Sequence, residues 1–173
     1  WNFPLLNVGF KLGPALASGC SIIIKPSALS PLSAYILGKI IHDIDFPAGV
    51  VNILSGPTSE VATTLSKSKI PSVLTMIGST ATGQRVIADS STSIKKLSME
   101  LGGNAPFIVF EDADIDKALD LAIGIKFGNS GQICVAANRF FVHKSLYNSF
   151  LEKYVERVNN LKLGFGIDQK PDM

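Results

Sequence analysis

The chain has 173 residues, of which 46% are hydrophobic, and a formal net charge of +2. This composition excludes a disordered chain and gives enough length for one sizeable domain or parts of two. Lys and Arg are scattered apart from the pair Lys95-Lys96, so no nucleic-acid-binding face is indicated. The uncharged run Leu12–Ile24 is too short to span a membrane, and we expect no membrane partner.

Strand and helix signals alternate along the chain. In chain order we predict a buried strand at Ser21–Lys25, a helix beginning at Ser30-Pro31, a strand at Val50–Leu54, a short helix from Thr58, a strand at Val73–Ile77, a helix ending near Asp89, strands at Lys95–Glu100 and Pro106–Phe110, a helix from Asp114 through Lys126, a strand ending at His143 and a helix from Ser145 to about Asn159. Ser30, Asp114 and Ser145 are the expected N-caps. This alternation predicts an α/β fold with a mainly parallel sheet.

Cysteines and histidines are few and widely spaced. Cys20, Cys134, His42 and His143 have no metal-ligand spacing, so we predict no metal site. Two distant cysteines fit a reducing, cytoplasmic location better than a disulfide scaffold. The chain begins without Met inside an apolar segment and ends in a polar stretch, so we expect it to be a piece of a longer protein.

Ligands of parallel α/β sheets bind beyond the carboxyl ends of the strands. Three stretches leave a strand there: Lys25–Ser27, Gly78–Gly83 and Glu100–Gly103. In GSTATG, at 78–83, the glycines permit close backbone approach, and the free N–H groups at the helix start favour a phosphate. The stretch lacks the P-loop Lys and the GxGxxG spacing, so a plain tight turn is an equal alternative.

Two further residues allow a chemical and a structural interpretation. Glu100 precedes two glycines and is either a general base or a solvated carboxylate beside a turn. Cys134, in NSGQICVAANR at 129–139, is a core thiol, a metal ligand or a nucleophile, and no basic residue lies close to it in sequence. Taken singly, each residue favours the structural interpretation.

Six stretches, taken together, carry a family resemblance: WNFPL, KLGPALASGCSIIIKPS, FPAGVVNILSG, GST-x-x-G, MELGGNAPFIVFEDADID and NSGQICVAANR. In this order they resemble the NAD(P)-dependent aldehyde dehydrogenase superfamily, most of all its succinate-semialdehyde dehydrogenase branch. The most specific feature is the Glu of ELGG, followed 34 positions later by the Cys of GQxC. The resemblance implies an incomplete three-layer, Rossmann-like parallel sheet. Residues 1–101 would be the later part of the NAD(P)-binding domain, and residues 102–173 the beginning of the catalytic domain.

The resemblance also implies catalytic roles. Cys134 would attack the aldehyde carbonyl and form a thiohemiacetal. Asn2 would stabilise the oxyanion together with the backbone N–H of Cys134. Glu100 would activate the water that hydrolyses the thioester, which favours release of a free acid over transfer to coenzyme A.

Cofactor binding is implied for a second set of residues. Lys25 would hold the adenosine ribose and Ser79 the pyrophosphate. The other implied positions are Ser27, Ala28, Gly56, Gly78, Gly83, Leu101 and Gly102. Many NAD-preferring members carry Glu at the position of Ala28, where a carboxylate would repel a 2′-phosphate. We therefore expect NAD or NADP as cofactor, with NADP accepted.

The aldehyde itself is left open between two alternatives. Branch members that hold a substrate carboxylate use arginines at the positions of Gly128 and Phe10, and a carboxylate buried without a cation is costly. The substrate is therefore either a semialdehyde held by other parts of the protein or a small neutral aliphatic or hydroxy aldehyde. The parent protein is expected to be a homodimer or homotetramer. The alternative function is an inactive, truncated or structural member of the family.

Overall fold

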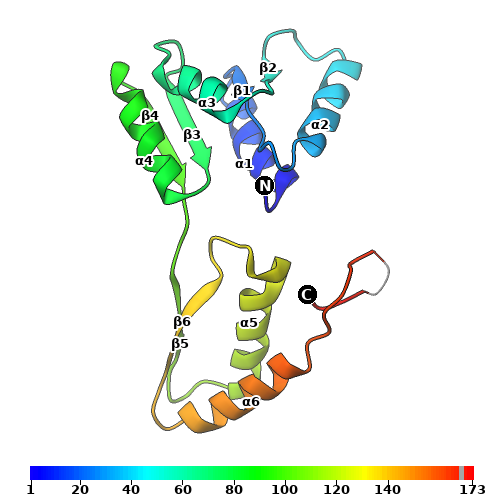
Figure 1. Ribbon diagram of the computed structural model, residues 1–173, viewed down its shortest axis with the longest axis vertical. Coiled ribbons are helices and arrows are strands. Elements are labelled where there is room, and N and C mark those ends of the chain that lie inside the picture. The colour runs from blue at the N-terminus through cyan, green and yellow to red at the C-terminus, as the bar shows by residue number, and fades with distance from the viewer. Residues whose placement is uncertain (168–169) are drawn as a thin grey trace. The chain divides into compact units, whose positions relative to one another are not determined.

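The computed structural model describes residues 1–167 and 170–173, which form two compact units, Trp1–Leu101 and Gly102–Met173. Figure 1 labels their α-helices and strands. The first unit contains α1 (Pro4–Ala17), β1 (Ile22–Ile24), α2 (Leu32–Asp43), β2 (Val51–Ile53), α3 (Thr58–Lys67), β3 (Val73–Ile77), α4 (Thr80–Asp89), the 3-10 turn η1 (Ser90–Thr92) and β4 (Lys96–Glu100). The second contains β5 (Ala105–Val109), α5 (Ile115–Phe127), the 3-10 turn η2 (Gly128–Gly131), β6 (Ala137–Val142) and α6 (Tyr147–Asn159).

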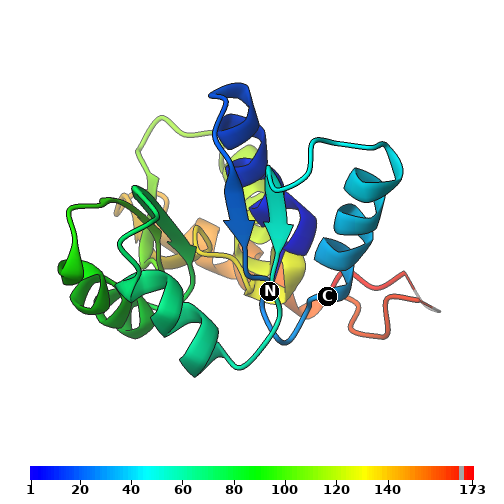
Figure 2. The same ribbon diagram turned by 90° about the horizontal axis from the view of Figure 1, so that it is seen from above.

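Every described strand pairs in parallel with one neighbour: β1 with β2, β3 with β4, and β5 with β6. Figure 2 shows the arrows of β1 and β2 running side by side in the same direction. The predicted α/β class with parallel pairing is therefore confirmed.

The β3–β4 pair brings two of the candidate stretches together. Ile77 lies opposite Glu100 at the carboxyl end of the pair. The next residue, Gly78, donates its backbone N–H to the Glu100 carbonyl over 2.9 Å. The turn GSTATG and the side chain of Glu100 therefore leave the same edge of one sheet.

The N-terminal part of the first unit differs from expectation. Helix α1 was not predicted, because Gly9, Gly13 and Pro14 all weaken a helical signal. The strand predicted as buried at Ser21–Lys25 is shorter, and Ile23 in it is 46% exposed. Ile22 and Ile24, whose side chains point to the other face, are half-buried.

Of the three expected helix caps, one is confirmed. The Asp114 carboxylate accepts the backbone N–H groups of Asp116 and Lys117 at 3.1 and 3.2 Å. The bond from the Lys117 N–H is the largest cause of a pKa of Asp114 below its ordinary value. Sequence reasoning therefore placed the start of α5 correctly.

The caps predicted at Ser30 and Ser145 are wrong. Helix α2 begins one residue later than expected, with Pro31 in the cap position. Helix α6 begins after Leu146, and the Ser145 hydroxyl instead bonds Nδ1 of His143 at 2.8 Å. In both cases the serine precedes the helix in sequence, but its hydroxyl accepts no backbone N–H from the first turn.

The core of the second unit fixes the frame around the loop between α5 and β6. Its buried residues are Val109, Leu119, Ala122 and Phe150. Partly buried side chains from both strands and both helices pack against them, among them Phe107, Phe140, Val142, Leu146 and Tyr154. This packing joins α5 and α6 to the β5–β6 pair, so the loop that carries Cys134 departs from and returns to a fixed scaffold.

Candidate functional site

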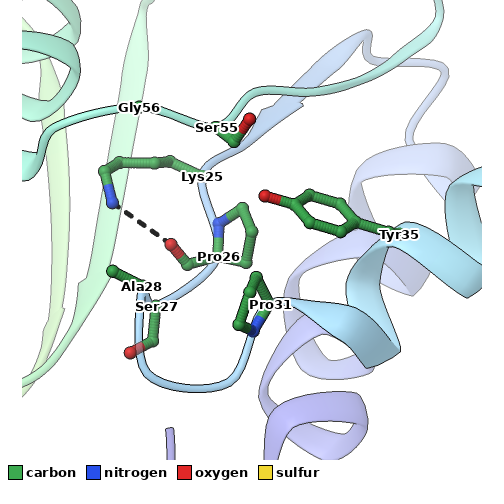
Figure 3. A pocket seen from close by; sticks show the side chains of 8 residues that line it. All are labelled: Lys25, Pro26, Ser27, Ala28, Pro31, Tyr35, Ser55 and Gly56. Atoms are coloured by element: carbon green, nitrogen blue, oxygen red, sulfur yellow. Dashed lines mark hydrogen bonds between the residues drawn. The ribbon is translucent and has the colours of Figure 1, made fainter.

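A hollow lies beyond the carboxyl ends of β1 and β2 (Figure 3). Its volume is about 180 Å³, less than that of pockets that bury whole drug-sized ligands. Its lining residues are Lys25, Pro26, Ser27, Ala28, Pro31, Tyr35, Ser55 and Gly56. Four residues predicted to bind the cofactor thus share one hollow, which is large enough for a sugar-sized group.

The polar groups of this hollow are held in place by local bonds. The ammonium of Lys25 donates to the carbonyl of Pro26 over 3.1 Å, as the dashed line in Figure 3 marks. The hydroxyl of Ser27 accepts the N–H of Leu29 at 3.2 Å. Gly56 has φ +147°, and a Cβ there would lie 2.8 Å from Cγ2 of Val61, so this wall of the hollow requires glycine.

At the GSTATG turn, Ser79 is the N-cap of α4. Its hydroxyl accepts the N–H of Thr82 at 3.2 Å and lies 2.9 Å from the Thr82 hydroxyl. Gly83 is buried, and a Cβ there would come within 2.7 Å of Cδ2 of Leu101. Gly83 therefore leaves the space that the side chain of Leu101 fills, and this packing explains why a glycine stands at position 83. Gly78 and Ser79 are exposed at the helix start, where a phosphate could bind.

Glu100 has an electrostatic partner that the sequence analysis missed. The ammonium of Lys11, on α1, lies 4.0 Å from Oε1 of Glu100, whose side chain is 60% exposed. At this distance and exposure the attraction is weak, on the order of 0–1 kcal/mol. No sequence signal pointed to Lys11, because α1 itself was not predicted.

Asn2 lies two residues before α1, in the same unit. Its side-chain oxygen accepts the backbone N–H of Phe3 at 3.1 Å and the amide of Asn7 at 3.2 Å. These two bonds assign the orientation of the amide, with its oxygen turned toward the start of the helix.

Cys134 lies in a turn that follows an unusual backbone segment. Asn129, Ser130 and Gly131 have φ values of 51°, 56° and 72°, so three consecutive residues are left-handed. For the two non-glycine residues this conformation costs energy, and such strain clusters at functional sites. The turn itself closes with the N–H of Ala136 donating to the Ile133 carbonyl at 3.1 Å. The thiol of Cys134 is exposed in this chain and forms no disulfide.

The candidate residues divide between the two units. Asn2, Glu100 and the residues of the hollow belong to the first unit, and Cys134 and Gly102 to the second. Within the described residues, no three His, Cys, Asp or Glu side chains gather in a way that could hold a metal ion. Over the same part of the chain, no helix has the length and apolar character needed to cross a membrane.

Comparison with known proteins places these residues in a family. Succinate-semialdehyde dehydrogenase (NADP+) 1 of Schizosaccharomyces pombe is 46% identical over 97% of this chain and 34% of its own length. D-glyceraldehyde dehydrogenase (NADP+) of Picrophilus torridus is 43% identical over 95% of this chain and 33% of its own length. A solved 3,6-anhydro-L-galactose dehydrogenase in complex with NAP superposes on all of this chain and 36% of its own, with a TM-score of 0.95 and 39% identity.

The chain therefore spans about a third of the length of these relatives. The match to the family itself covers residues 1–173. The chain belongs to the aldehyde dehydrogenase family.

Proposed function

We propose that the full-length protein oxidises an aldehyde to a carboxylic acid with NAD+ or NADP+. The observation that carries the proposal is the exposed, unpaired thiol of Cys134, in a turn that follows three left-handed residues, in a chain of this family. The Cys134 thiolate adds to the aldehyde carbon and gives a thiohemiacetal. Loss of a hydride from that carbon leaves a thioester, and water releases the acid and restores the thiol.

Asn2 and Glu100 serve this sequence of steps at different points. The amide of Asn2, oriented by the two bonds to its oxygen, donates with the Cys134 N–H to the oxyanion. The Glu100 carboxylate accepts a proton from the water that attacks the thioester. The ammonium of Lys11 lies 4.0 Å from this carboxylate.

The hollow beside Lys25 fits one part of a dinucleotide. Lys25 presents an ammonium, Ser27 a hydroxyl and Gly56 a wall without a side chain, which suits a ribose. The exposed start of α4 at Gly78-Ser79 suits the pyrophosphate. A bound nicotinamide cofactor supplies the hydride acceptor, and the protein orients it. We propose residues 1–101 as the later part of the cofactor-binding domain and residues 102–173 as the beginning of the catalytic domain.

Replacing Ala28 by Glu is expected to weaken NADP+ binding about tenfold and to leave NAD+ binding within about threefold. Ala28 is exposed in the lining of the hollow, and a carboxylate there would face the 2′-phosphate at a cost on the order of 1 kcal/mol or more. Fluorescence titration of both cofactors measures the effect. Ala28→Gln has the same size without the charge and should leave the ratio unchanged. A wild-type protein that binds NADP+ many-fold more weakly than NAD+ would contradict the argument.

Two substrate classes are proposed, a semialdehyde and a small neutral aldehyde. The relatives named above include one enzyme of each kind. Neither Phe10, 62% exposed on α1, nor Gly128 offers a cation to a substrate carboxylate.

Turnover is therefore expected on a neutral aldehyde, with kcat/KM within about tenfold of the value for the acid. Without a cation opposite its carboxylate, the acid lacks the charge-assisted contact that would favour it over the neutral aldehyde by about tenfold or more. The measurement compares succinate semialdehyde with butyraldehyde under saturating NADP+. A much stronger preference for the acid would show that a cation elsewhere in the protein holds the carboxylate. No oxidation of any aldehyde would favour the inactive member of the family.

Assembly as a homodimer or homotetramer stays a prediction from the family resemblance, and a cytoplasmic location stays a prediction from the two distant cysteines.

A further inference from the structure

We propose that Gly103 is a positioning residue for Cys134, because only a residue without a side chain lets the carbonyl of Cys134 pack against it. The proposal rests on the proposed function, in which Cys134 is the nucleophile. It adds a residue that neither binds substrate nor reacts, and it lies wholly within the second unit.

The contact between the two residues is close. A Cβ built on Gly103 would lie 2.6 Å from the carbonyl oxygen of Cys134 and 3.8 Å from its carbonyl carbon. Real side chains do not approach a backbone oxygen this closely, so any residue other than glycine must displace one of the two segments. The atom in the way belongs to the backbone and cannot move aside by a change of rotamer.

The segment that follows Cys134 has little freedom to shift. Ala136 and Ala137 are 4% and 1% exposed, and Ala137 pairs with Ala105 in the β5–β6 sheet. Gly103 and Cys134 thus lie just before the first pair of this sheet, at the amino ends of β5 and β6. Their contact continues the contact between the two strands into the loop. Because Ala105, two residues after Gly103, is held in the same pair, a side chain at Gly103 would displace the turn that holds Cys134.

Two neighbouring bonds show that this end of the sheet is fixed from both sides. Nε of Arg139 donates to the carbonyl of Asn104 over 3.0 Å. Asn138 is the extra residue of a β-bulge, because Ala105 and Pro106 pair with Ala137 and Arg139. Its side-chain oxygen accepts from the ammonium of Lys126, at the end of α5, over 2.8 Å. Bulges of this kind are frequent next to active sites, where they aim a side chain.

The consequence for catalysis follows from the position of the thiol. The direction of the Cys134 Cα–Cβ bond is set by the peptide groups on either side, and the carbonyl packed on Gly103 fixes one of them. A shift of about 1 Å in a reacting group can cost on the order of 10²-fold in rate. Gly103 therefore acts on the rate of attack by Cys134 and not on substrate affinity.

The test replaces Gly103 by Ala in the full-length protein. We expect kcat for aldehyde oxidation to fall about 10- to 100-fold, with KM changed less than about threefold. Hydrogen exchange, followed by mass spectrometry, should become faster in the peptide that covers residues 128–137. Exchange in α6 should stay at the wild-type rate, which separates a displaced loop from a general loss of folding.

The matched control is Gly124→Ala, the same substitution on α5, where a Cβ would meet nothing within 4 Å. It should leave kcat and loop exchange unchanged. Arg139→Lys keeps the charge but loses the Nε donor, and it should give a smaller change in the same direction even if Gly103→Ala fails to fold. Wild-type kcat and loop exchange in Gly103→Ala would overturn the inference. A wild-type protein without aldehyde oxidation would overturn the proposed function, and loop exchange would then decide the positioning role by itself.

Discussion

Replacing Cys134 by Ala is expected to lower the kcat of aldehyde oxidation by on the order of 10⁴-fold or more, the scale on which a lost nucleophile acts. Without the thiol no thiohemiacetal forms, and a hydride would have to leave a free aldehyde hydrate without covalent catalysis. The measurement is the formation of reduced cofactor by absorbance at saturating substrate. Cofactor binding should persist, because the hollow at Lys25 belongs to the other unit.

The chain offers a matched control for this substitution in its second free cysteine. Cys20 is also exposed, and its thiol lies 3.9 Å from the Ser18 carbonyl, outside every stretch assigned to the site. Cys20→Ala should therefore retain wild-type turnover. A thiol-reactive aldehyde analogue should label both cysteines, but cofactor with substrate should protect Cys134 alone. Equal turnover in Cys134→Ala and Cys20→Ala would remove the proposed mechanism.

Local patterns in the sequence predicted the parts of the fold that depend on local physics. Alternating strands and helices gave the α/β class, and Asp114 marked the start of α5 because its carboxylate accepts two nearby N–H groups. The same rule failed at Ser30 and Ser145. At Ser145 a side-chain partner, His143, competes for the hydroxyl. Helix α1 was missed because its glycines and internal proline weaken the helical signal of the sequence.

Residues of the candidate site could be named from the sequence only where they recur in motifs. Lys25, Ser27, Ala28 and Gly56 were named from the resemblance, and they do line one hollow. The proximity of Lys11 to Glu100 depends on packing between segments far apart in sequence. No pattern of residue types shows such a contact.

The same limit holds for the backbone around Cys134. Asn129 and Ser130 are residues that any loop could contain, and their left-handed conformation is a property of the folded chain. The close contact between Gly103 and the Cys134 carbonyl likewise cannot be predicted from the motif ELGG, because either of its glycines could form the turn. Structure therefore adds to the motifs the reason why a particular glycine tolerates no side chain.

Replacing Glu100 by Gln is expected to separate the two halves of the reaction. Gln has the same shape but cannot accept a proton from water, so thioester hydrolysis should slow by about 10²- to 10⁴-fold. Thiolate attack and hydride loss use Cys134 and Asn2, and they should proceed for one turnover. Rapid mixing should then show a burst of one reduced cofactor per active site, followed by slow steady-state turnover. Mass spectrometry should find the acyl group on Cys134.

The control is Glu111→Gln, since Glu111 is 73% exposed and its carboxylate lies 3.7 Å from His143, away from the candidate site. Its burst and steady state should match the wild type. Loss of the burst together with steady-state turnover in Glu100→Gln would mean that this carboxylate acts before hydride transfer, as the base for Cys134. An unchanged steady state would instead assign it to the solvated carboxylate that the sequence alone favoured. The burst thus distinguishes three roles for one side chain, and only slow hydrolysis after a full burst agrees with a base that acts on water.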